Sequence, residues 1–148
     1  MGLQQYIDTD MPKDSKSALY AFLFHLRTPL AGIRTIAAVI DKLAGTDIPI
    51  EAREWFRKWL PKVDLWLNSA IQLTELLGKS ESQDQGWKAL IQQLLTTLDG
   101  VEVAADEAKK IPYSEVIAFG DLLHSIISSI EHISDDYKVM KELLPTLD

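Results

Sequence analysis

The feature that most constrains this chain is a spacing of apolar residues that alternates between four and three. Three runs with this spacing lie at 52–77, 87–108 and 119–144. A mean step of 3.5 residues keeps one stripe of a helix turned towards its neighbours, and no segment alternates with a period of two. The sequence therefore predicts an all-α protein. The run nearest the N-terminus comprises Leu19, Leu23, Leu26, Leu30, Ile33, Ala37 and Ile40.

Turn-forming residues separate the apolar runs and set the expected helix limits. Asp14 or Ser15 is suited to cap the first helix, and Ser114 the fourth. Short connections make successive helices antiparallel. We therefore expect residues 1–148 to form one domain, an up-down antiparallel four-helix bundle. Its helices are predicted at about residues 15–44, 50–78, 84–110 and 114–144.

Two prolines interrupt the first two predicted helices. Pro29 and Pro61 would lie about 22 and 16 Å from the turn that joins these helices, at 1.5 Å of rise per residue. A proline inside a helix removes a backbone hydrogen bond and bends the axis, so both helices are predicted to kink at nearly the same level. Gly100 is expected to loosen the third helix.

Composition excludes several classes of function. The net charge of −7 disfavours binding to nucleic acid or to an anionic membrane surface. The chain has no cysteine, which excludes disulfides and thiolate metal sites. It shows no signal peptide and no uninterrupted apolar run of about 20 residues, the length needed to cross a bilayer. We expect a cytoplasmic protein without a cofactor.

One stretch, "FHLRTPLAGI" at residues 24–33, carries a resemblance to a known family. The run from Leu26 to Leu30 resembles the H-box of bacterial sensor histidine kinases, in their dimerisation and phosphotransfer domain (HisKA or DHp). The segment "REWFRKWLPKVDLWLNSAIQLTELL" is similar to the second helix of that domain. The likeness covers about residues 15–78 and implies that the first hairpin is kinase-like.

The histidine of this chain is out of register with the family pattern. The family's phosphoacceptor lies five residues before the proline, where this chain has Phe24. His25 occupies the next place, which normally holds an acid, and Leu26 follows it. The shift rotates the imidazole by about 100° around the helix and leaves it without an adjacent carboxylate in the sequence. No glycine-rich phosphate loop follows, so we do not expect autokinase activity.

Three functional hypotheses remain open. By resemblance, the first is a non-catalytic module that binds a response-regulator receiver domain or a histidine kinase, as a regulator or scaffold of two-component signalling. Its docking surface would include Phe24, His25, Arg27 and Thr28, with the facing start of the second helix. The second is a stand-alone histidine phosphotransferase that uses His25. The third is a structural bundle that forms a homodimer.

Other polar residues have spacings that occur in metal sites. Asp121 and His124 have the i, i+3 spacing of di-iron bundles, but those sites need a second such motif and further carboxylates. His132 shares a helix face with Asp135 and Asp136, which we expect to be solvated. No metal site is therefore predicted.

The four tryptophans are expected in or beside the core. Trp59, Trp66 and Trp87 fit the apolar stripe, whereas Trp55 lies next to it. An exposed Trp55 would indicate a binding patch.

Overall fold

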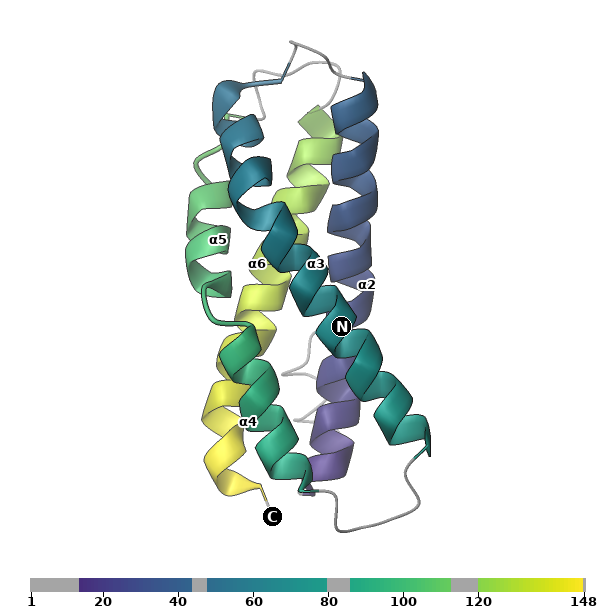
Figure 1. The fold of residues 1–148 in the computed structure, drawn as a ribbon. Coiled ribbons are helices and arrows are strands. Elements are labelled where there is room, and N and C mark those ends of the chain that lie inside the picture. The colour runs from purple at the N-terminus through teal and green to yellow at the C-terminus, as the bar shows by residue number, and fades with distance from the viewer. Residues whose placement is uncertain (1–13, 44–47, 80–85, 113–119, 148) are drawn as a thin grey trace.

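The computed structural model describes residues 14–43, 48–79, 86–112 and 120–147. Within these ranges the chain is helical and has no strand, which confirms the predicted all-α class (Figure 1). The elements are α2 (Ser15–Leu43), α3 (Ile50–Lys79), α4 (Trp87–Thr97), α5 (Val101–Ala108), α6 (Gly120–Leu143) and the 3₁₀ helix η2 (Leu144–Thr146).

The helices of the described ranges alternate in direction along the long axis of the molecule. Figure 1 shows α3 returning beside α2, α4 and α5 continuing one another in the opposite direction, and α6 returning again. The helix α2 packs against both α3 and α6, and α5 packs against α6 and α3. Four helical rods, the third made of α4 and α5, therefore surround one core.

The core consists of the predicted apolar stripes. Every residue of the first stripe (19–40) and of the third stripe (87–108) is buried. Most residues of the second stripe (52–77) and the fourth stripe (119–144) are buried as well. At the ends of the stripes, Leu73, Leu77 and Leu144 are only partly buried against this core. Phe119, the predicted start of the fourth stripe, lies outside the described residues. Heptad spacing thus identified the inward face of each rod.

The first helix begins with a side-chain cap. The backbone N–H of Ser17 donates a hydrogen bond to Oδ1 of Asp14 at 2.8 Å, which satisfies one of the amides that a helix start leaves unpaired. The same hydrogen bond lowers the pKa of the Asp14 carboxyl. Of the two predicted caps, Asp14 makes this bond, while Ser15 is buried as the first helical residue. The Ser114 cap predicted for the fourth helix lies outside the described residues.

The third predicted helix, 84–110, is not continuous. It is broken into α4 and α5 at residues 98–100, where Gly100 has φ +96°. A Cβ at residue 100 would lie 3.4 Å from the Trp59 ring. That distance is an ordinary van der Waals contact, so the left-handed conformation is what favours glycine here. Gly100 therefore ends one helix and starts another rather than loosening a single one. The next apolar residue, Val101, is fully buried, so the break keeps the stripe in phase.

Three indole N–H groups of α3 donate hydrogen bonds to the third rod, which consists of α4 and α5. Trp55 Nε1 donates to the carbonyl of Ala104 at 2.9 Å, and Trp66 Nε1 donates to the carbonyl of Thr97 at 2.8 Å. Trp59 Nε1 donates to a side-chain carboxylate of α5. Trp55 is 3% exposed, so the alternative that it marks a surface patch is wrong.

Both interior prolines lie within helices that continue past them. Pro29 is inside α2 and Pro61 is inside α3. The ring of a proline inside a helix leaves one carbonyl of the preceding turn without its usual donor. The bend expected at each position stays a prediction.

The helix α2 corrects one expectation from composition. Residues Ser15–Ile40 are long and apolar enough, by length and composition, to cross a membrane, although we expected no such segment. The residues share this property with core helices of soluble proteins. In this fold the apolar stripe of α2 is covered by α3 and α6, although only 33% of the apolar window is buried.

Candidate functional site

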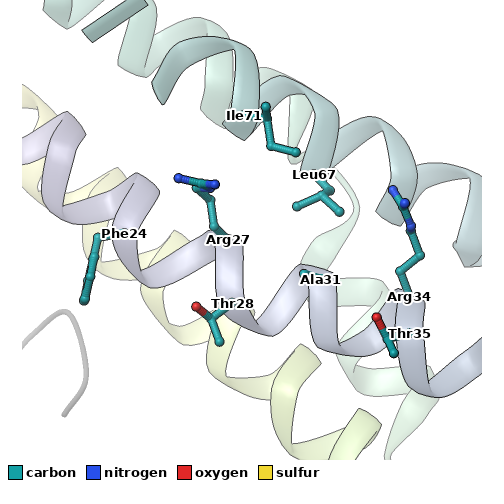
Figure 2. A pocket seen from close by; sticks show the side chains of 8 residues that line it. All are labelled: Phe24, Arg27, Thr28, Ala31, Arg34, Thr35, Leu67 and Ile71. Atoms are coloured by element: carbon teal, nitrogen blue, oxygen red, sulfur yellow. The ribbon is translucent and has the colours of Figure 1, made fainter. Parts of the chain in front are cut away.

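A groove of about 570 Å³ lies between α2 and α3 at the level of residues 24–33 (Figure 2). The α3 side of the groove is formed by Leu67 and Ile71, in the second half of that helix. The prediction that the start of the second helix faces the H-box is therefore wrong, because antiparallel packing sets that start beside the end of α2. The α2 side is formed by Phe24, Arg27, Thr28, Ala31, Arg34 and Thr35.

Phe24 is the most exposed large apolar residue of the described chain. Its side chain is 67% exposed, and it lies at one end of the groove with the ring turned away from α3 (Figure 2). The ring meets the imidazole of His25 edge-on, with the centroids 5.5 Å apart and an interplanar angle of 85°. An exposed phenyl ring beside polar groups is typical of a contact surface.

The groove carries positive charge on an acidic protein. Arg27 and Arg34 both extend from α2 towards α3 (Figure 2). The Nε of Arg34 lies 3.8 Å from Oδ1 of Asp64, and both side chains are more than half exposed, so this ion pair is weak. Arg27 forms no ion pair within the described ranges. The guanidinium of Arg27 is therefore available to an anionic group.

His25 turns away from the groove and towards α6. Its ring centroid lies 6.5 Å from that of His132. His132 Nε2 is 3.4 Å from Oδ2 of Asp136, one helical turn further along α6. Ligand atoms of these three side chains all lie within 4.8 Å of one another. The structure thus supplies His25 with a carboxylate neighbour from α6, which the sequence around His25 lacks.

The surroundings of His25 lower the pKa of its imidazole. Partial burial lowers the pKa of His25, the Asp136 carboxylate opposes this shift, and the neighbouring His132 lowers the pKa further. A neutral imidazole is the form that acts as a nucleophile or a metal ligand. Asp136 itself is 3% exposed, so the expectation that it is solvated is wrong.

The predicted site residues fall into two groups. Phe24, Arg27 and Thr28 line the groove, whereas His25 faces α6. The contact of His25 with Asp136 joins residues far apart in the sequence. The i, i+4 spacing of His132 and Asp136 was the available signal, but spacing alone does not say which helix lies opposite.

The second candidate pair on α6 is not part of this group of three. Asp121 and His124 are both exposed, and within the described ranges only His25, His132 and Asp136 converge as a group of three metal-ligand side chains. Among the described residues, Asp121 and His124 belong to no such group, so the ligands that a di-iron centre requires are not assembled there.

Comparison of the chain with protein-family models, with curated protein sequences and with solved structures finds no match.

Proposed function

We propose that the protein is a non-catalytic helical module that binds a receiver domain of a two-component system, or a histidine kinase, as regulator or scaffold. The proposal rests on the resemblance of residues 15–78 to the dimerisation domain of histidine kinases. We also propose that the helical bundle has the fold of that domain. It also implies a cytoplasmic location. One observation carries it: the H-box-like segment presents Phe24, 67% exposed, at the end of a groove between α2 and α3.

The composition of the groove supports a protein partner with an acidic centre. Phe24 provides apolar area at one end of the groove, and Leu67 and Ile71 provide apolar area on its α3 side. The guanidinium group of Arg27 is suited to donate paired hydrogen bonds to carboxylate or phosphoryl oxygens. A receiver domain carries such groups around its phosphorylated aspartate, which is the chemistry that an Arg-bearing groove on an acidic protein would recognise.

The test is binding of the full chain to purified receiver domains from the same genome, with and without an aspartyl-phosphate mimic. Phe24→Ser and Arg27→Ala should each weaken binding about tenfold or more, as for central interface residues. Val103→Ser and Arg53→Ala are matched controls, because both residues are exposed and lie outside the groove. Equal loss in controls and groove variants, or no binding to any receiver or kinase, contradicts the proposal. Self-association without a partner would favour the structural homodimer.

A second candidate, a histidine phosphotransferase, is favoured by the position of Asp136. The His25 imidazole would attack the phosphorus of a receiver's aspartyl phosphate, forming an N–P bond as the P–O bond to the aspartate breaks. Asp136, within 4.8 Å, would take the imidazole proton. A gain of one phosphoryl group by intact mass, lost in His25→Gln and reduced in Asp136→Asn, would establish this activity. No mass gain in the unmodified chain would exclude it for the receivers tested.

A further inference from the structure

Two helices that are far apart in the sequence bring three metal-ligand side chains together. His25 comes from α2, and His132 and Asp136 come from successive turns of α6. At 1.5 Å per residue, His25 lies about 15 Å from the start of α2 and His132 about 17 Å from the end of α6, so antiparallel packing sets them at one level. We propose that these three side chains bind a zinc ion between α2 and α6.

The distances fit the coordination of Zn²⁺. Zinc binds imidazole nitrogen and carboxylate oxygen at about 2.0–2.2 Å, so neighbouring ligand atoms of a tetrahedral site lie about 3.3–3.5 Å apart. His132 Nε2 and Asp136 Oδ2 are already 3.4 Å apart. The ligand atoms of the group all lie within 4.8 Å of one another, so reaching tetrahedral spacing requires a shift of at most about 1.5 Å, within reach of a rotation about the χ angles of His25.

Burial and charge favour a cation at this place. The Asp136 side chain is 4% exposed, and a carboxylate in the interior is stabilised by positive charge close to it. A zinc ion supplies two positive charges where a protonated histidine supplies one. The ion would also tie α2 to α6 by direct bonds, and so stabilise the folded chain by mass action.

The accessibility of the site indicates an open coordination position. The His132 side chain is 41% exposed and His25 is half-buried, so the imidazoles border solvent while the carboxylate lies inside. Two histidines and one carboxylate leave the fourth place of a tetrahedral zinc site open to water. The bound water would be acidified by the ion.

The ligand types select the metal class. Two imidazoles with a single carboxylate suit Zn²⁺ and its neighbours in the first transition series, whereas Ca²⁺ and Mg²⁺ require mostly oxygen ligands. The site does not depend on the proposed docking groove, because Arg27, Thr28 and the other groove residues contribute no ligand.

The test is calorimetric titration of the chelator-treated full chain with ZnCl₂, with MgCl₂ as the comparison metal. We expect one Zn²⁺ per chain and no binding of Mg²⁺. His25→Gln and His132→Gln should each weaken zinc binding by at least about 100-fold, since even loss of a group that only supports a ligand costs 10–100-fold. His124→Gln is the matched control, because His124 is an exposed histidine of the same helix outside the group, and it should leave the affinity unchanged.

A second readout separates a defined site from loss of folding. Co²⁺ in place of Zn²⁺ should give a visible absorption spectrum typical of four- or five-coordination, abolished in His25→Gln while circular dichroism shows unchanged helix content. Asp136→Asn adds evidence only if it remains helical, because Asp136 is buried. Absence of zinc binding, or equal zinc binding by the unmodified chain and the folded His25→Gln and His132→Gln variants, overturns the proposal. No receiver domain is present in this experiment, so its outcome is independent of the proposed function.

Discussion

Trp59 and Glu107 join α3 to α5 through a hydrogen bond of 2.6 Å from the indole Nε1 to Oε2. The other oxygen, Oε1, accepts a hydrogen bond from Lys58 Nζ at 2.7 Å. The Lys58 hydrogen bond, and then that from Trp59, lower the pKa of the Glu107 carboxyl below its usual 4.5. One carboxylate thus links two adjacent side chains of α3 to the helix after the break.

The link through Glu107 should make stability depend on pH in the acid range. A carboxyl whose pKa is lower in the folded state contributes stability above its unfolded pKa of about 4.5, and loses it as pH falls through the folded pKa. In Glu107→Gln, the free energy of unfolding should therefore fall less between pH 6 and pH 3 than in the unmodified chain. Urea titrations at several pH values measure this difference. Glu54→Gln, at an exposed residue of α3, should keep the original slope, and an unchanged slope in Glu107→Gln would contradict the assignment.

Substitutions of two glycines, one at the break between α4 and α5 and one inside α2, should have opposite effects on the stability of the fold. Gly100→Ala should destabilise the fold by about 1–3 kcal/mol, because residue 100 has a positive φ that alanine adopts only with strain. Gly32→Ala should stabilise it by about 0.5–1 kcal/mol, because Gly32 is inside α2 with open space around a Cβ. Thermal and urea denaturation measure both. Stabilisation by Gly100→Ala would show that residues 98–100 form a continuous helix.

The cap at the start of α2 should be measurable by removing its acceptor. Asp14→Ala should cost about 0.5–2 kcal/mol of folding free energy, since the amide of Ser17 loses its partner. Asp14→Asn should restore most of that loss, because asparagine caps as well as aspartate. Chemical denaturation of the three proteins tests the pair. An equal loss in both variants would indicate that the charge matters and the hydrogen bond does not.

The indole of Trp55 should stabilise the fold through the hydrogen bond of its N–H as well as through its buried area. Trp55→Phe keeps most of the buried ring but removes the donor to the Ala104 carbonyl, and should destabilise the fold by about 1–3 kcal/mol. Phe56→Leu, at a buried neighbour that donates no side-chain hydrogen bond, serves as the control for loss of aromatic volume. Differential scanning calorimetry of both variants gives the comparison.

The buried face of each helix could be predicted from the sequence, but the break in the third rod could not. Leu26, Leu30 and Ile33 were identified as core because helical periodicity is a local property, and all three are 0% exposed. The break at residues 98–100 was missed because the step from Leu98 to Val101 keeps the same spacing across it.

The candidate site could be predicted only in part. Phe24, Arg27 and Thr28 share a groove because they are close in sequence on one helix. The approach of His25 to Asp136 depends on which helices are neighbours and on their relative rotation. Neither is encoded in the spacing of residues along a single helix, so the sequence predicted a solvated Asp136.

The placement of the tryptophans decides what spectroscopy can observe in this protein. All four indoles lie on α3 or α4, and three of them donate hydrogen bonds across the contact of α3 with the third rod. Intrinsic fluorescence will therefore follow separation of that half of the molecule and will respond little when α6 detaches from α2. Native fluorescence emission together with reduced circular dichroism would therefore indicate that α2 and α6 separate first, at the contact of His25 with His132.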